Sequence, residues 1–281
     1  MSLLTINKLT ADVGAEVAGI DPDRLATDQS IGEAILEALE DNGVLVFRGL
    51  NLAPEAQVAF CQRLGEVDRS SDGHHPVSGI YPITLDTSKN SAAAYLKATF
   101  DWHIDGCTPL GDECPQKATV LSAVHVAERG GETEFASAYA AYESLTDGEK
   151  EHYGTLRVVH SLEASQRRVT PDPSPELLAR WRARPTHEHP LVWTHRSGRK
   201  SLVLGASADY IVGMEPGDGK QLLAELLDHA TEADRVYSHR WEVGDTVIWD
   251  NQGVLHRAAP YDPASPREML RTTVLGNEPI Q

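Results

Sequence analysis

Residues 243–276 read VGDTVIWDNQGVLHRAAPYDPASPREMLRTTVLG, and their pattern predicts the core of the fold. VGDTVIW has the β-branched and aromatic residues of a buried strand, and the turn residues DNQG follow it directly. VLHRAA then returns alongside as a second strand, and MLRTTVLG reads as a third. Short strands joined by tight turns are typical of a β-sandwich or a jelly roll.

The same alternation of short apolar runs and turn residues continues along much of the chain. From about residue 117, runs rich in Val, Leu and Ile are separated by Gly, Pro, Asp and Ser. These runs predict further strands at residues 118–126, 156–161, 190–195, 201–205 and 245–249. We detect no internal repeat and no low-complexity tract, so a single domain of residues 1–281 is the expected organisation.

Helical periodicity marks other segments of the chain. Apolar residues recur at helical spacing in residues 30–43 and again in residues 53–65. VLVF, residues 44–47, lies between them and reads as a buried strand. A third helix is predicted at residues 219–230, and Ser137 is a predicted N-cap of another. The sequence therefore predicts an α+β, mainly β fold, in which helices pack outside a double-sheet core.

The composition argues against several classes of partner. The chain has 281 residues, with 25 Lys and Arg against 42 Asp and Glu, and a formal net charge of −17. This charge repels a polyanion, so we expect no nucleic-acid partner. No segment approaches the roughly 20 apolar residues that cross a bilayer, so we expect no membrane partner. The three cysteines form no CxxC pair, which favours a reducing cytoplasm.

The stretch FDWHIDGC, residues 100–107, places His103 and Asp105 two positions apart. Side chains at i and i+2 leave the same face of an extended chain, so both could bind one metal ion. An HxD pattern arises by chance roughly once in a chain of this composition. A hydrogen-bonded turn is therefore the simpler interpretation of this stretch taken alone.

His256, in VLHRAA, supplies the residue type that the HxD pattern lacks. A distant histidine joined to a local HxD is the arrangement of the 2-His-1-carboxylate triad, which leaves coordination positions of Fe(II) open. Open positions allow a substrate or cosubstrate to bind the metal directly. A zinc or manganese hydrolase on a cupin-like barrel would use the same three ligands, and this alternative stays open at this point.

Arg267 and Arg271 are four residues apart in REMLR, so a strand would direct both side chains to one face. Two cations that point inward are costly unless each finds an anion. The anion is either an Asp or Glu of this acidic chain or a bound carboxylate, which matches the planar guanidinium fork. In GGETEF, residues 130–135, paired glycines allow a tight turn, and Thr133 offers a hydroxyl to an anion.

As a set, these motifs resemble the TauD/TfdA family of Fe(II)- and 2-oxoglutarate-dependent dioxygenases, and its 2,4-dichlorophenoxyacetate branch more than its taurine branch. The resemblance runs in order through nearly the whole chain. It is carried by VLVFRGLNL, WHID, GGETEFAS with AAYESL, THRSGRKSLVLG, LLAELLDHAT, YSHRWEVGDTVIWDNQGVLHRAAPYD and PREMLRTTVLG. It implies a double-stranded β-helix, the jelly-roll core of cupin-like proteins, with flanking helices.

The resemblance also implies two binding roles for the residues described above. His103, Asp105 and His256 would be the ligands of Fe(II). Thr133 and Arg267 would bind the distal carboxylate of the cosubstrate 2-oxoglutarate, whose keto acid end would chelate the metal. O2 would be the other cosubstrate.

Arg271 and the WDN motif would surround this site, again by resemblance. Arg271 would lie near the metal and serve either the proximal carboxylate of 2-oxoglutarate or an anionic group of the substrate. Trp249, Asp250 and Asn251 would fix the turn that presents His256.

The implied reaction hydroxylates a C–H bond of a small anionic substrate and converts 2-oxoglutarate to succinate and CO2. Retention of Asp105 favours hydroxylation, because related halogenases replace this carboxylate. Aryloxyalkanoates, sulfonates and sulfate esters are the expected substrates, and an amino acid or a biosynthetic intermediate is the alternative. A non-catalytic 2-oxoglutarate-binding or cupin-like metal protein is the alternative of another class. Family members are often dimers or tetramers, so we expect a homo-oligomer.

Residues 66–100 depart from both branches of the family, in the segment that closes over the substrate. His75, Tyr95 and Lys97 are the candidates for substrate contact, together with Arg271. A solvated loop residue is the alternative for each of the first three. Cys107 either lines the pocket or packs as a small buried hydrophobe.

Overall fold

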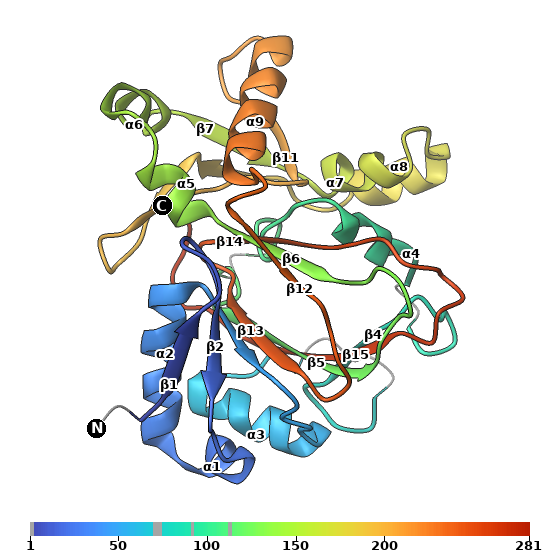
Figure 1. Cartoon of the computed structure of the whole chain (residues 1–281). Coiled ribbons are helices and arrows are strands. Elements are labelled where there is room, and N and C mark those ends of the chain that lie inside the picture. Colours follow the sequence, from blue (N-terminus) through green and yellow to red (C-terminus); the bar gives the residue numbers. More distant parts are fainter. Residues whose placement is uncertain (1–2, 70–74, 91–92, 112–113) are drawn as a thin grey trace.

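Two β-sheets lie face to face at the centre of the molecule, and helices cover their outer sides (Figure 1). The structure is a computed structural model, and it describes residues 3–69, 75–90, 93–111 and 114–281. Apolar side chains fill the space between the sheets. This cluster includes Val46, Leu121, Phe135, Trp249 and Met269. Side chains alternate along each strand, so one face of each sheet contributes to this buried layer.

The larger sheet has seven strands and brings together distant parts of the sequence. In order across the sheet they are β1 (Thr5–Lys8), β2 (Ala15–Ala18), β3 (Val44–Phe47), β13 (Thr246–Asp250), β5 (Ala118–His125), β15 (Glu268–Val274) and β4 (Tyr81–Ile83). Neighbouring strands are antiparallel except β2 and β3, which run parallel. β13 and β15 flank β5, so two strands predicted from the C-terminal segment form the middle of the sheet.

The smaller sheet has three antiparallel strands, in the order β12 (Val236–His239), β6 (Thr133–Ser137) and β14 (Val254–Ala258). The DNQG turn carries the chain from β13 in the larger sheet to β14 in this one. The two predicted strands are confirmed, but the expectation that they lie alongside each other is wrong. They lie in facing sheets, because each pairs with other strands and the turn crosses between the layers.

Three helices cover the outer face of the larger sheet, and they are α1 (Pro22–Thr27), α2 (Gln29–Asn42) and α3 (Pro54–Leu64) (Figure 1). Ile31, Ile35 and Leu39 of α2 are buried and pack in one cluster with Leu45 and Ile248 of the sheet. This is the apolar stripe that the sequence periodicity predicted. Both helices predicted in this part of the chain are confirmed to within one residue at each end.

The rest of the chain forms a layer beyond the smaller sheet (Figure 1). Its elements are α5 (Ala138–Glu143), α6 (Asp147–Tyr153), β7 (Arg157–His160), α7 (Leu162–Val169), α8 (Pro175–Arg182), β8 (His187–Pro190), β9 (Val192–Thr194), β10 (Lys200–Leu202), β11 (Ala208–Ile211) and α9 (Pro216–Ala230). The Ser137 hydroxyl accepts a hydrogen bond from the Ala140 amide at 3.1 Å and so caps α5, as predicted. Between β4 and β5 lie α4 (Ala93–Leu96) and the short 3-10 helix η1 (Lys97–Phe100), and η1 contacts β14.

The strand predicted at residues 201–205 ends early, because the chain turns toward the centre of the molecule at Gly205. The amide of Ala206 donates a hydrogen bond to the carbonyl of Trp102 at 2.8 Å. A Cβ atom at Gly205, whose φ is +111°, would lie 2.8 Å from the Cα atom of His103. Glycine allows this close approach, which supports the backbone of the WHID stretch from one side.

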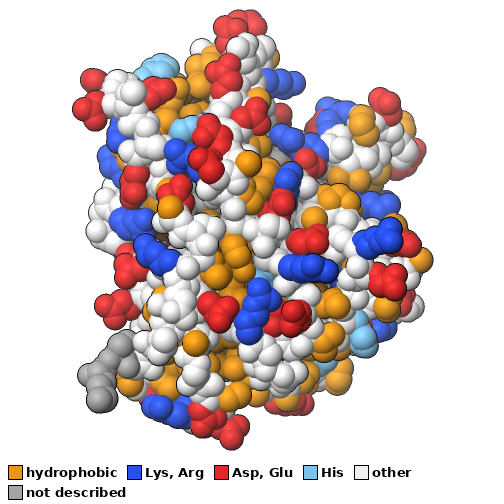
Figure 2. All heavy atoms as spheres, in the orientation of Figure 1, with side chains coloured by type: hydrophobic (Ala, Val, Ile, Leu, Met, Phe, Trp, Pro, Cys, Tyr) orange, Lys and Arg blue, Asp and Glu red, His pale blue; other side chains and the backbone are white. Residues whose placement is uncertain are grey.

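The surface carries charges of both signs. On the face shown in Figure 2, acidic and basic side chains are interspersed, and apolar side chains lie between them. The excess of acidic residues therefore does not form a separate block on this face. Within the described residues, no helix is long and apolar enough to cross a bilayer.

Candidate metal centre

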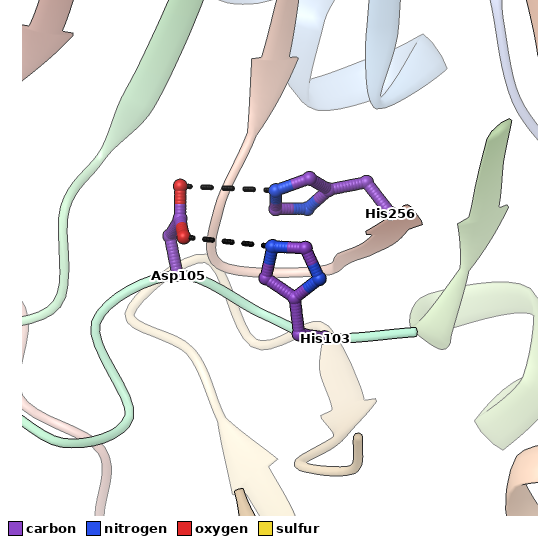
Figure 3. A group of neighbouring side chains, drawn as sticks. All are labelled: His103, Asp105 and His256. Atoms are coloured by element: carbon purple, nitrogen blue, oxygen red, sulfur yellow. Dashed lines mark ion pairs between the residues drawn. The ribbon is translucent and has the colours of Figure 1, made fainter. Parts of the chain in front are cut away.

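His103, Asp105 and His256 converge on one point, with both imidazole rings facing the carboxylate (Figure 3). The Nε2 atom of His103 lies 3.9 Å from one carboxylate oxygen of Asp105, and the Nε2 atom of His256 lies 3.7 Å from the other. One potential ligand atom of each residue lies within 4.8 Å of those of the other two. The three side chains can therefore share one ion, as the sequence predicted.

A backbone bridge brings the two histidines together. The His103 amide donates to the His256 carbonyl at 3.0 Å, and the His256 amide donates to the His103 carbonyl at 2.9 Å. This is an isolated antiparallel bridge, and a turn begins at Asp105, so WHID is not a regular strand. Asp105 therefore reaches the site through the turn at Gly106 (φ +89°) rather than through strand alternation.

A backbone carbonyl selects the tautomer of His103. Its Nδ1 atom lies 2.8 Å from the carbonyl oxygen of Asp101. Because a carbonyl only accepts, Nδ1 carries the proton and the lone pair is on Nε2, the atom nearest Asp105. Such outer hydrogen bonds are usual for histidines that bind metals.

The charges of the three groups suit a cation. Burial and, to a smaller extent, the neighbouring His103 lower the pKa of His256 to about 3, so this imidazole is neutral at physiological pH. Burial alone would raise the pKa of Asp105, but the nearby His256 and His103 rings and the Arg271 guanidinium favour the carboxylate form and lower that pKa. A deprotonated carboxylate and a neutral imidazole are the donor states that a metal ion requires.

The donor set fits Fe(II). Two imidazole nitrogens and one carboxylate oxygen, with no thiolate among them, make up the facial triad of non-haem iron oxygenases. Three ligands that lie on the same side of an ion leave its other coordination positions open. The site can therefore hold an iron that binds a cosubstrate directly.

A cavity between the sheets contains the triad and the two arginines that the sequence singled out. Its polar lining comes from Thr99, His103, Asp105, Thr133, His256, Arg257, Arg267 and Arg271. Its apolar lining comes from Ile83, Leu85, Leu96, Phe100, Leu121, Trp249, Ala258 and Tyr261. Cationic groups inside an otherwise apolar cavity are suited to a small anionic ligand.

Arg267 is buried, with 3% of its surface exposed, and it enters the cavity just before β15. Its Nη2 atom donates to the Gly131 carbonyl at 3.1 Å, and its guanidinium lies 4.8 Å from the centroid of the Tyr261 ring. A Cβ atom at Gly131 would lie 2.9 Å from its Nε atom, so the paired glycines make room for it. Burial lowers its pKa. Arg267 forms no ion pair with any carboxylate of the described residues, which favours a bound anion as its partner.

Arg271 lies on β15 and lines the same cavity as the triad, and its charge lowers the pKa of Asp105. Its guanidinium lies 4.9 Å from the centroid of the Tyr81 ring. Its Nε atom is buried and has no hydrogen-bond partner among the described residues. A buried guanidinium N–H without a partner is costly, so this group also favours a bound anion.

Thr133 and the WDN motif are buried against the cavity. Thr133 is 4% exposed, and its hydroxyl oxygen accepts a hydrogen bond from Trp241 Nε1 at 2.9 Å. The Trp249 ring lies 4.9 Å from the ring of His256. Asp250 accepts hydrogen bonds from the Tyr139 hydroxyl and the Gln252 amide, both at 3.2 Å, while Asn251 Nδ2 donates to the Thr119 hydroxyl at 2.8 Å. These bonds hold the turn between β13 and β14.

His75, Tyr95 and Lys97 are not among the described residues that line the cavity. Tyr95 and Lys97 are exposed, and the Nδ1 atom of half-buried His75 accepts from the Val77 amide at 3.1 Å. Leu96, Thr99 and Phe100 line the cavity instead. Spacings of three and four residues put these three on one face of the helical turn, and Tyr95 and Lys97 on its flanks. Substrate contact by the predicted residues stays a prediction, and their positions do not favour it.

Several aromatic contacts of the site were not predicted from the sequence. Tyr81 lies under Arg271, Tyr261 lies over Arg267, and Trp241 donates to Thr133. Trp241 and Tyr261 both fall inside a motif that carries the family resemblance, in HRWEVGD and APYD. This position is the sequence signal that could have indicated a role for them in the site. Tyr81 falls in residues 66–100, which match no family motif, so the local sequence did not indicate that it contacts Arg271.

Residues 5–273 match the family model described as "Taurine catabolism dioxygenase TauD, TfdA family". The chain belongs to the TauD/TfdA family. The α-ketoglutarate-dependent 2,4-dichlorophenoxyacetate dioxygenase of Cupriavidus pinatubonensis is 36% identical to this dioxygenase over 251 residues, which cover 84% of this chain and 86% of the relative. The (S)-phenoxypropionate/α-ketoglutarate-dioxygenase of Sphingobium herbicidovorans is 33% identical over 280 residues, which cover 97% of this chain and 95% of the relative.

Solved structures agree with this assignment. The crystal structure of AAD-2 in complex with Mn(II) and N-oxalylglycine matches this dioxygenase with a TM-score of 0.82 and 30% sequence identity, over 99% of each chain. The predicted α+β jelly-roll core with flanking helices is confirmed, as is the resemblance to the 2,4-dichlorophenoxyacetate branch. The protein is an Fe(II)- and 2-oxoglutarate-dependent dioxygenase that uses O2, so the hydrolytic and non-catalytic alternatives are set aside.

Proposed function

We propose that His103, Asp105 and His256 hold the Fe(II) of this dioxygenase. The convergence of their ligand atoms within 4.8 Å carries this proposal. When bound, the metal couples oxidation of 2-oxoglutarate by O2, which gives succinate and CO2, to hydroxylation of a substrate C–H bond. The chain contributes the ligands and their orientation, and the apolar side chains of the cavity limit contact of the reacting groups with water.

Thr133 and Arg267 would bind the distal carboxylate of 2-oxoglutarate. Both line the cavity that contains the triad, and Arg267 has no ion pair with a carboxylate of the described residues. A guanidinium donates two parallel hydrogen bonds to a carboxylate, and the hydroxyl adds a third. Trp249, Asp250 and Asn251 would support His256 from the turn that precedes β14, through the contacts described above.

The substrate would be a small molecule with an anionic group and an apolar body. Arg271 supplies the cation, and its partnerless Nε atom points to an anion near the metal. Leu85, Leu96 and Phe100 supply apolar walls for the body. Aryloxyalkanoates, sulfonates and sulfate esters combine both features, and relatives are named for dichlorophenoxyacetate and phenoxypropionate.

The position of attack would decide the products. Hydroxylation of the carbon next to an ether oxygen gives a hemiacetal or hemiketal, which breaks the C–O bond and leaves a phenol and a carbonyl compound. The same insertion next to a sulfonate or sulfate breaks a C–S or C–O bond. In each case the oxygen atom of the new hydroxyl ends in the carbonyl product.

A panel of anionic aryl ethers, sulfonates, alkyl sulfates and amino acids tests this function. With Fe(II) and 2-oxoglutarate in air, we expect at least one aryloxyalkanoate, sulfonate or sulfate ester to raise succinate release about tenfold or more above the uncoupled rate. Succinate and the cleaved product are quantified together, and anaerobic samples are the control. Stimulation by amino acids alone would exclude the proposed substrate class.

Arg271→Ala distinguishes binding of substrate from binding of 2-oxoglutarate. We expect the KM for the best panel substrate to rise about tenfold or more, because a buried anion loses its charged donor. The Kd of 2-oxoglutarate, measured without substrate, should change less. Calorimetry gives the Kd of 2-oxoglutarate, and steady-state succinate assays give the KM for the substrate. Arg271→Lys keeps the charge, so its KM should lie between those of the wild-type protein and Arg271→Ala. A larger effect on 2-oxoglutarate would assign Arg271 to the cosubstrate instead.

We further propose that the protein acts in the cytoplasm as a single domain of residues 1–281. Three cysteines without any disulfide support a reducing compartment. A homo-oligomer, either a dimer or a tetramer, is proposed from family resemblance, and size-exclusion chromatography with light scattering would measure it. Its partners would be small molecules, with neither nucleic acid nor membrane among them, and the net charge of −17 supports the first exclusion.

A further inference from the structure

Trp241 and Thr133 form a buried hydrogen bond at the wall of the cavity. The indole Nε1 atom lies 2.9 Å from the hydroxyl oxygen of Thr133, and the two residues are 7% and 4% exposed. Thr133 lines the cavity together with Arg267. Trp241 does not, and it lies behind Thr133, where it lines a separate surface recess with Gly131 and the other side of Arg267.

This bond determines which way the threonine hydroxyl can donate. A hydroxyl has one proton and two lone pairs, whereas an indole N–H donates and cannot accept. When Trp241 occupies one lone pair of Thr133, the hydroxyl proton has to point to a different acceptor. The hydroxyl proton is therefore free for an anion inside the cavity, beside the guanidinium of Arg267.

The indole is held in place from the side away from the cavity. The ring of buried His239 lies 4.4 Å from the Trp241 ring in an edge-to-face contact. Asp245, 1% exposed, accepts hydrogen bonds from the amides of Gly49 and Glu242 at 3.0 and 3.1 Å and so closes the turn that carries Trp241. The N–H direction is thus fixed by the fold rather than by the ligand.

We propose that Trp241 is a positioning residue for 2-oxoglutarate, which orients the Thr133 hydroxyl so that it donates to the distal carboxylate. This inference rests on the proposed function, in which Thr133 and Arg267 bind that carboxylate. It assigns to Trp241 an energetic effect that acts through one hydroxyl group. A role in packing alone would not depend on that hydroxyl.

A double-mutant cycle separates these two roles. The ligand is N-oxalylglycine, an analogue of 2-oxoglutarate, and its affinity for the Mn(II)-loaded protein is measured by calorimetry without any turnover. The variants are Trp241→Phe, Thr133→Val and the double variant. We expect Thr133→Val to weaken binding about tenfold and Trp241→Phe about threefold to fivefold, because a hydrogen bond to a charged group is lost or misdirected. The double variant should bind as Thr133→Val does.

Control variants address packing. Trp181→Phe removes a second buried indole, 3% exposed, whose N–H has no hydrogen-bond partner among the described residues, and its affinity should equal that of the wild-type protein. Thr133→Ser keeps the hydroxyl and should retain most of the affinity. If Trp241→Phe does not fold, Trp241→Met takes its place in the cycle, because methionine is apolar and has no hydrogen-bond donor in its side chain. Thermal unfolding confirms that each variant is folded.

The outcomes are distinguishable. The inference would be overturned if Trp241→Phe weakened the binding of N-oxalylglycine by the same factor in the wild-type protein and in Thr133→Val. Trp241 would then act through packing and not through the Thr133 hydroxyl. An effect of Thr133→Val without any effect of Trp241→Phe would also overturn it, while the proposed carboxylate site stands. Unchanged affinity in Thr133→Val would overturn both the inference and the role of Thr133 in the proposed function.

Discussion

His256→Ala is expected to abolish metal binding and, with it, all turnover of 2-oxoglutarate. The variant removes one of the three proposed ligands, the imidazole that burial keeps neutral and therefore able to bind a metal ion. Loss of an outer-shell partner already costs about 10- to 100-fold in metal affinity. Loss of a ligand should therefore exceed about 100-fold. Titration with Mn(II) or, under anaerobic conditions, with Fe(II) measures the affinity directly.

Two comparisons make the His256→Ala result specific. Asp105→Ala should have the same effect, because each of its carboxylate oxygens faces one of the two imidazoles. His160→Gln is the control. His160 is a fully buried histidine at the end of β7, in the sheet of β11, β7 and β8, and it is hydrogen-bonded to Ser207 outside the cavity. This variant should alter the melting temperature but leave metal affinity unchanged. Retention of metal by His256→Ala at an affinity close to that of the wild-type protein would remove His256 from the ligand set.

The helices and central strands were predictable because their signals are local. The apolar stripe of α2 and the alternating runs of β5, β13 and β15 need only a short window of sequence. Pairing between strands is not local. The parallel contact of β2 with β3 and the assignment of β13 and β14 to different sheets depend on residues far apart. β8, with the sequence HEHP, has no apolar alternation and is a strand only because it pairs with β7.

Whether a residue of the candidate site could be predicted also depended on whether its signal is local in the sequence. His103, Asp105 and Arg267 were predicted because these residue types are costly to bury and form a specific set. Trp241 was missed, because its role comes from the pairing of β12 with β6, which sets His239 opposite Thr133. The tryptophan, two residues further along, then reaches the same hydroxyl. Tyr95 and Lys97 were chosen for their chemistry, but the helical turn directs their apolar and small neighbours inward.

Backbone contacts that the sequence could not predict hold His103 and His256 in place. His103 and His256 are joined through two backbone hydrogen bonds, and Gly205 packs on the His103 backbone from a third segment. Side chains held by paired backbone move less than side chains on open loops. The three side chains are thus held close together without a bound ion, which would reduce the ordering cost of binding one.

Arg267→Ala is expected to weaken 2-oxoglutarate binding by roughly 30-fold or more while leaving metal affinity unchanged. The guanidinium is 3% exposed and has no ion pair with a described carboxylate. In the free protein it donates to the Gly131 carbonyl and lies against the Tyr261 side chain, and the charge of Glu132 acts on it without forming an ion pair. A bound carboxylate supplies the missing charge. Removing one partner of a buried charge pair costs about 2–5 kcal/mol, and each 1.4 kcal/mol is about tenfold in affinity.

A second arginine of the same cavity provides the matched control for Arg267→Ala. Arg257 also lines the cavity, but it is already paired with Glu134 at 2.6 Å and lies 4.7 Å from the centroid of the Trp102 ring. Because its charge is satisfied within the protein, Arg257→Ala should change the Kd of 2-oxoglutarate by less than about threefold. Arg267→Lys keeps a cation without the planar fork and should recover part of the affinity. Calorimetry on the Mn(II)-loaded protein gives all three values. Equal losses in Arg257→Ala and Arg267→Ala would mean that general charge, rather than a bond from Arg267, attracts the cosubstrate.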